Sequence, residues 1–104
     1  MIKIEEAFKN KKAFIPFVLA GYPNLEATEK FILKMAEAGA DLIEIGIPFS
    51  DPVAEGTVIQ AASKVALSGN MTTNDIFDMA EKLKGKVNIP LVFMTYINPI
   101  FRLW

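Results

Sequence analysis

The sequence predicts an α/β protein in which parallel strands alternate with helices. Three short apolar runs predict the strands, at residues 13–20, 42–47 and 89–96. Between them, apolar residues recur every three or four positions, which is typical of helices that bury one face. Strands that alternate with helices favour right-handed βαβ units and therefore a parallel sheet.

The N-terminal segment is expected to place a short helix before the first strand. Residues 1–12 mix apolar and charged residues at helical spacing, as in a short amphipathic helix. The strand 13–20 follows and contains Pro16. Because proline has no N–H group to donate to a neighbouring strand, we expect either a bulge or a break in the hydrogen-bond ladder there.

The second strand is the stretch around which the other elements are arranged. The helix 25–38 leads into it, with Asn24 expected as its N-cap and Gly39 as its terminator. The inward face of this helix is expected to be Leu25, Thr28, Phe31, Ile32, Met35 and Ala36. The nearly continuous apolar run 42–47 is typical of a strand buried on both faces. Glu44 interrupts this run, and a carboxylate is costly to bury there unless it reaches a polar cavity.

The C-terminal half is expected to contain a long loop, two helices and the third strand. Residues 48–56 show no periodicity and include two prolines, which indicates a loop. A helix is expected over residues 57–67. A second is expected from Thr72 to about residue 84, because Thr72 and Asp75 have the spacing of a capping box.

This order of elements favours the opening part of a (β/α)₈ TIM barrel, with about three parallel strands and their covering helices. A doubly wound sheet is the alternative. We expect residues 1–104 to be one partial barrel domain, truncated after its third strand. Since 52% of the residues are hydrophobic, the chain is either almost entirely core or lacks a partner that would cover it.

The composition argues against several classes of function. With a net charge of −1 the chain lacks a basic surface for phosphate backbones, so nucleic-acid binding is not expected. The sequence has no Cys and no His, which excludes disulfides, thiolate metal sites and imidazole catalysis. No apolar run approaches the roughly 18 residues of a membrane span. The N-terminus shows no signal-peptide pattern, so a cytoplasmic location is expected.

The candidate chemistry lies at the carboxyl ends of the strands, where parallel α/β folds build their active sites. Glu44 is in the later part of its strand, and the following loop carries Asp51 and Glu55. Two carboxylates in different surroundings can divide acid and base work between them. The alternative is structural: Glu44 pairs with a Lys or Arg or lies at a wet edge, and the two loop acids are ordinary solvated side chains.

Four more residues near these strand ends are candidates. Tyr96 and Asn98 lie at the end of the third strand as polar groups that can line a pocket, although Asn98 before Pro99 is equally a turn signal. From the pattern alone, Phe17 and Met94 are more typical of core than of substrate contacts. The sequence has no glycine-rich phosphate loop of the G-x-G-x-x-G or P-loop type.

Several segments together resemble one known family, the tryptophan synthase α chain. The resemblance extends from the first strand to the end of the chain, and its most specific part is the Gly-Ile-Pro-Phe-Ser-Asp-Pro segment. The matching segments are Phe14-Ile15-Pro16-Phe17, Gly21-Tyr22-Pro23, residues 43–56, Ile59-Gln60 and Met94-Thr95-Tyr96-Ile97-Asn98-Pro99.

The resemblance implies a lyase of tryptophan biosynthesis that cleaves indole-3-glycerol phosphate to indole and glyceraldehyde 3-phosphate. In this retro-aldol reaction the indole ring is protonated at C3, the glycerol hydroxyl is deprotonated and the C–C bond breaks. Glu44 matches the catalytic glutamate of the family. Glu55 matches its second catalytic acid, which is normally an aspartate, and the added methylene can move the carboxylate by more than about 1 Å.

The resemblance also implies substrate and partner contacts. The expected substrate contacts are Phe17, Met94 and Tyr96. The expected contacts with the β chain of an α₂β₂ complex are Pro48, Asp51, Pro52 and Asn98. In the family, indole passes through a tunnel to the β chain, which holds pyridoxal phosphate, so no cofactor is expected in this chain.

The resemblance covers only the first three strands of a longer family chain. The glycine-rich backbone that binds the substrate phosphate in the family falls outside it, and both sheet edges are exposed. We therefore expect the 104 residues alone to be catalytically inactive and prone to associate. Two other interpretations are a noncatalytic module that docks on the β chain, and a structural remnant left by a premature stop or a frameshift.

Overall fold

The computed structural model describes residues 4–8, 12–48, 57–67 and 71–95. Helices and strands alternate in these ranges as the sequence predicts. In chain order they are α1 (Ile4–Ala7), β1 (Phe17–Leu19), α2 (Leu25–Glu37), β2 (Ile43–Gly46), α3 (Thr57–Leu67), α4 (Thr73–Leu83) and β3 (Leu91–Met94). None of the described helices is long and apolar enough to cross a membrane.

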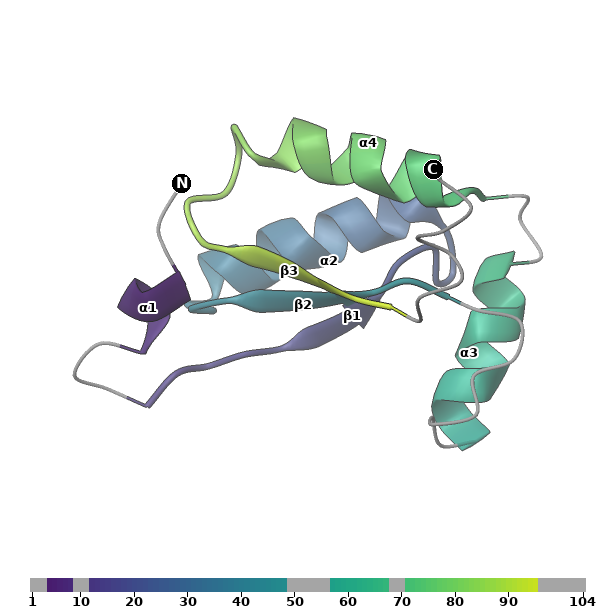
Figure 1. Cartoon of the computed structure of the whole chain (residues 1–104), viewed down its shortest axis with the longest axis horizontal. Helices are drawn as coiled ribbons and strands as arrows, with labels where there is room; N and C mark the ends of the chain where they lie inside the picture. The colour runs from purple at the N-terminus through teal and green to yellow at the C-terminus, as the bar shows by residue number, and fades with distance from the viewer. Residues whose placement is uncertain (1–3, 9–11, 49–56, 68–70, 96–104) are drawn as a thin grey trace.

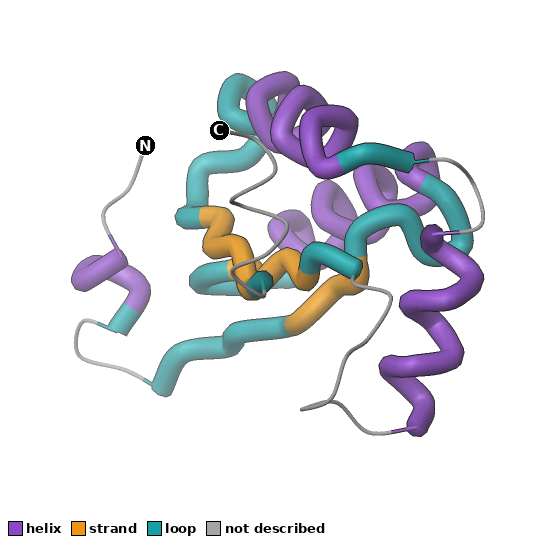
Figure 2. Tube along the Cα trace, turned by 45° about the vertical axis from the view of Figure 1, so that its right-hand side comes forward, coloured by secondary structure: helices purple, strands orange, loops and turns teal. Residues whose placement is uncertain are grey.

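The three strands form one parallel sheet in the order β1-β2-β3. Helices α2 and α4 lie together on one side of this sheet (Figure 1). Helix α1 lies near the amino ends of the strands and α3 lies beyond their carboxyl ends, as the turned view also shows (Figure 2). The described part of the chain is therefore a sheet with one helical layer.

Strand β1 is shorter than predicted because it begins only after Pro16. Residues before it still run beside β2, since the Asp41 N–H donates to the Phe14 carbonyl at 2.9 Å and the Glu44 N–H donates to the Pro16 carbonyl at 3.0 Å. The regular strand therefore begins after Pro16, while backbone hydrogen bonds to the β2 segment continue at and before this proline. β1 lies at the edge of this sheet, where a missing N–H group is tolerated.

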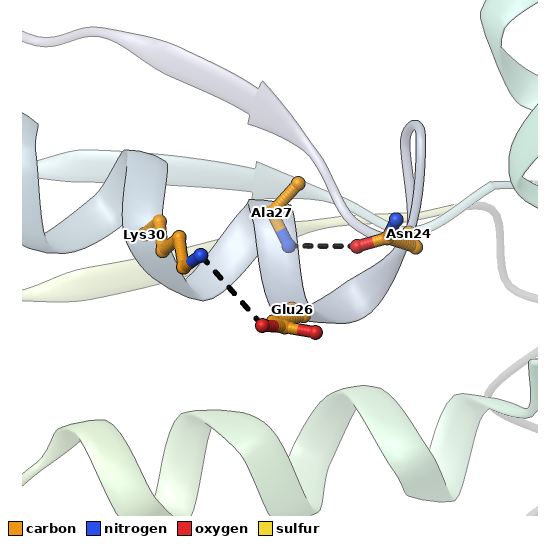
Figure 3. Close-up of polar contacts among 4 residues, drawn as sticks. All are labelled: Asn24, Glu26, Ala27 and Lys30. Carbon is orange, nitrogen blue, oxygen red and sulfur yellow. Dashed lines mark hydrogen bonds and ion pairs between the residues drawn. The ribbon is translucent and has the colours of Figure 1, made fainter.

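Helix α2 begins where the sequence predicts. The Asn24 side chain accepts a hydrogen bond from the Ala27 N–H at 2.8 Å, and one turn later Lys30 Nζ lies 3.6 Å from Glu26 Oε1 (Figure 3). The helix ends at Glu37, one residue earlier than expected. Gly39 follows with a φ of 104°, a left-handed conformation that favours glycine after a helix.

A buried threonine joins the start of α2 to the turn after β1. Thr28 is fully buried, and its Oγ1 accepts from the Gly21 N–H at 2.9 Å and donates to the Asn24 carbonyl at 3.0 Å. The turn that leaves the carboxyl end of β1 is therefore held by a side chain from the helix that follows it.

The remaining elements agree with the predictions in type. Helix α3 has the expected bounds, and α4 begins with the capping box: the Asp75 N–H donates to Thr72 Oγ1 at 3.1 Å, and the Thr72 N–H donates to Asp75 Oδ2 at 2.9 Å. Strand β3 is shorter than the predicted run 89–96. Of the predicted loop 48–56, only Pro48 lies inside the described residues.

The core lies between the sheet and the helices α2 and α4. Its centre is formed by fully buried side chains from the strands and from both helices, and the Phe77 ring of α4 packs edge-on against Phe93 of β3, with centroids 4.9 Å apart. The largest buried apolar residues of this core are Ile32, Ile43, Ile45, Ile76 and Leu83.

Candidate functional site

The strand register divides the sheet into two chemically different faces. Phe17, Glu44 and Val92 lie in one row across the sheet, and Val18, Ile45 and Phe93 lie in the next. Successive residues of a strand point to opposite faces, so these rows belong to opposite faces. We call the face toward α2 and α4 the covered face. We call the other the open face; its residues are Phe17, Leu19, Glu44, Gly46, Val92 and Met94.

Exposure separates the two faces clearly. On the covered face the Ile45 side chain is 0% exposed. On the open face Phe17 is 39% exposed and Met94 is 50% exposed, and neither belongs to the buried core. Large apolar side chains left accessible on one face of a sheet are typical of a binding surface.

Glu44 lies on the open face, in the central strand of the sheet. It is partly buried, and its strand neighbours in the same row are Phe17 and Val92. Across residues 4–8, 12–48, 57–67 and 71–95, Glu44 forms no salt bridge with a Lys or Arg. The alternative interpretation, in which a Lys or Arg side chain neutralises Glu44, therefore has no support among these residues. Glu44 thus lies on the open face with apolar residues on both sides, Phe17 and Val92.

The open face brings together three of the predicted site residues. Phe17 and Glu44 share one row of the sheet, and Met94 lies in the next row of the same face, beside Gly46. Pro48, a predicted partner contact, is buried directly after β2. The other predicted residues lie outside the described ranges: Asp51, Pro52, Glu55, Tyr96 and Asn98.

A hollow of about 290 Å³ lies at the β1 edge, between that strand and α2. Its lining residues are Phe17, Val18, Leu19, Tyr22, Phe31 and Met35. No pattern in the sequence predicts this hollow. The expectation that Phe31 lies on the inward face of α2 is wrong, because Phe31 is 45% exposed. Helical periodicity identifies an apolar stripe, but which part of the stripe is covered depends on the next element in space.

The described residues do not form a metal centre. Within them, no three acidic side chains come close enough together to hold an ion. Among the predicted site residues, the chemistry available on the open face is therefore one carboxylate beside an aromatic ring and a thioether. This set suits acid–base chemistry on an aromatic substrate.

Comparison with known proteins gives one consistent family. The family described as "Tryptophan synthase alpha chain" matches residues 4–103. The tryptophan synthase alpha chain of Lacticaseibacillus casei is 47% identical over 102 residues, which are 98% of this chain and 38% of the relative. That of Petrotoga mobilis is 51% identical over 100 residues, which are 96% of this chain and 39% of the relative.

Solved structures agree. The tryptophan synthase subunit alpha of Legionella pneumophila has a TM-score of 0.87 and 39% identity, covering 95% of this chain and 38% of that one. A chain in a crystal structure of tryptophan synthase from M. tuberculosis has a TM-score of 0.84 and 34% identity, covering 91% and 38%. The chain thus spans about two fifths of the length of these relatives. Its fold is the N-terminal portion of their (β/α)₈ barrel.

Proposed function

The chain belongs to the tryptophan synthase α chain family, and from this premise we propose that it supplies the acid–base part of the site that cleaves indole-3-glycerol phosphate to indole and glyceraldehyde 3-phosphate. The observation that carries the proposal is the position of Glu44. Its carboxylate lies on the open face in one row with Phe17, and no salt bridge neutralises it within the described residues.

The proposed roles follow from the reaction. A proton is delivered to C3 of the indole ring, the glycerol hydroxyl loses its proton, and the bond between C3 and the glycerol carbon breaks to leave an aldehyde. Glu44 handles the proton at C3 and at the hydroxyl. Glu55 stabilises the positive charge that develops on the indole nitrogen. Phe17, Met94 and Tyr96 contact the substrate.

The proposal includes a partner and a domain. We assign Pro48, Asp51, Pro52 and Asn98 to contact with a tryptophan synthase β chain in an α₂β₂ complex. The family assignment supports this partner, as does the match to a chain in a crystal structure of tryptophan synthase from M. tuberculosis. Pyridoxal phosphate belongs to that β chain. Residues 1–104 form one partial barrel domain in this proposal.

We further propose that the 104 residues do not turn over substrate alone. Among the described residues no layer covers the open face, and Glu44 is only partly buried there. Acid–base groups act best in a site that excludes water and holds the substrate in a reactive geometry. A sheet with one helical layer provides neither condition.

Indole release from indole-3-glycerol phosphate tests the proposal. The rate is measured for the chain as given, with and without a β chain, beside Glu44→Gln and the matched control Glu37→Gln, which changes an exposed acid of α2. We expect no release above the Glu44→Gln level from the chain alone. Release by the chain that persists in Glu37→Gln and disappears in Glu44→Gln would support the role of Glu44 and refute the proposed inactivity. Release that is equal in all three proteins would refute the role of Glu44.

The proposed partner is tested separately. The chain is mixed with a β chain, and co-elution is measured by size-exclusion chromatography. We expect a complex to form, because the segments assigned to the interface are present in this sequence. Separate elution at micromolar concentration, together with an unchanged rate of tryptophan formation from serine and indole, would contradict the assignment.

A further inference from the structure

Gly46 is the last residue of β2, and a side chain at this position would have no room. The glycines of the described chain that need a left-handed backbone are Gly21, with a φ of 86°, and Gly39, with a φ of 104°. Gly46 has no such conformation, so its backbone is open to any L-residue. A strand glycine that the backbone conformation does not require often marks a place where another group approaches closely.

The group that approaches is the ring of Phe17. A Cβ atom built on Gly46 would lie 2.6 Å from Cζ and 2.9 Å from Cε2 of that ring. It would also lie 3.3 Å from Cδ1 of Leu19. The ring therefore occupies the space that a side chain at position 46 would need.

The register shows which way the ring leans. The backbone of Phe17 pairs with Glu44, whereas Gly46 pairs with Leu19 and with Met94. The ring thus extends from the row of Glu44 to the row of Gly46, toward the carboxyl ends of the strands. There it lies over the central strand, in the row of Met94 and two residues beyond Glu44.

We infer that Gly46 is a positioning residue that lets the Phe17 ring lie close over β2 on the open face, so that its exposed side offers a stacking surface to an aromatic ligand beside Glu44. The inference rests on the proposed function, which makes the ligand an indole ring. A larger residue at position 46 lifts the Phe17 ring off the sheet and into the space that this ligand would fill. Offset stacking between aromatic rings then loses its surface.

Gly46→Ala tests the inference with little risk to the fold. The atoms in conflict are at the far end of a side chain that is 39% exposed, so the ring can turn away. We expect the thermal midpoint to fall by no more than about 5 °C. Indole affinity, measured by NMR titration, should weaken by about three- to tenfold. Gly85→Ala is the matched control, because a Cβ there meets no atom within 4 Å.

Two further measurements separate positioning from a general loss of structure. The first is the set of nuclear Overhauser contacts between the Phe17 ring protons and the α protons of residue 46, which should be strong in the original chain and lost in Gly46→Ala. The second is the double variant. If Gly46 acts through the ring, then adding Gly46→Ala to Phe17→Ala should leave indole affinity unchanged, since the group it displaces is absent.

Ring contacts that persist in Gly46→Ala would overturn the inference, as would displaced contacts with unchanged indole affinity. A further loss of affinity in the double variant would also overturn it. An original chain that shows the ring contacts but binds no indole would refute the proposed indole contact in this chain, while loss of those contacts in Gly46→Ala would still establish that Gly46 sets the ring position.

Discussion

The covered face and the open face of the sheet are made by alternate residues of the same three strands, yet the two faces have different roles. The covered face presents Val18, Ile45 and Phe93 to the two helices; Val18 and Ile45 are buried, and Phe93 is partly buried against the core. In the same strands, the open face presents Phe17, Glu44 and Met94, which are partly or largely accessible. Because neighbouring residues point in opposite directions, one strand can hold the fold with one set of side chains and present reactive groups with the other.

This difference shows how a carboxylate is tolerated in an apolar strand. Glu44 has Ile43 and Ile45 as chain neighbours, and both are 0% exposed. On their face a charge would lose its hydration without compensation. On the open face the same strand can carry it, so the position of the acid is set by the alternation of the strand.

The largest expected effect comes from the covered face. Ile45→Ala should lower the free energy of unfolding by about 3 kcal/mol, because it removes buried methyl groups and leaves a cavity. Urea denaturation followed by circular dichroism measures this. Val92→Ala is the control on the open face and should cost less than about 1 kcal/mol. Equal losses at the two positions would remove the distinction between the faces.

A smaller effect on stability is expected at Thr28, the buried threonine of helix α2. Thr28→Val keeps the shape of the side chain but leaves the buried Gly21 N–H without its acceptor, so the free energy of unfolding should fall by about 2 kcal/mol. Thr28→Ser retains the hydroxyl and should cost less than about 1 kcal/mol. If the two variants lose the same stability, the hydroxyl does not hold the turn, and packing alone accounts for Thr28.

Much of the helical layer could be predicted from local sequence. The Asn24 cap and the Thr72–Asp75 capping box fix the starts of α2 and α4 through residues within one turn, so a sequence window contains all the information. Gly39 likewise marks the end of α2. Strand ends were predicted less well, since β1 and β3 are shorter than their apolar runs. A strand ends where its neighbour stops pairing, and that depends on distant residues.

The candidate site was predictable in its residues but less so in its arrangement. Glu44 stands out as the acid in an apolar run, and Phe17 and Met94 were identified only through the family resemblance. Their common face depends on the register of three strands, which no local pattern fixes. Gly46 was missed for the same reason, because its role is visible only once the Phe17 ring is placed over it.

We propose that Glu44 lies on the open face because of its role in catalysis, and that it does not stabilise the folded protein. The free energy of unfolding of Glu44→Gln, measured in urea beside the original chain, tests it most directly. Residues kept for function often cost stability, so we predict a value equal to that of the original chain or up to about 1 kcal/mol higher. A loss of more than about 1 kcal/mol would contradict the claim, because it would show that the charge of Glu44 stabilises the sheet.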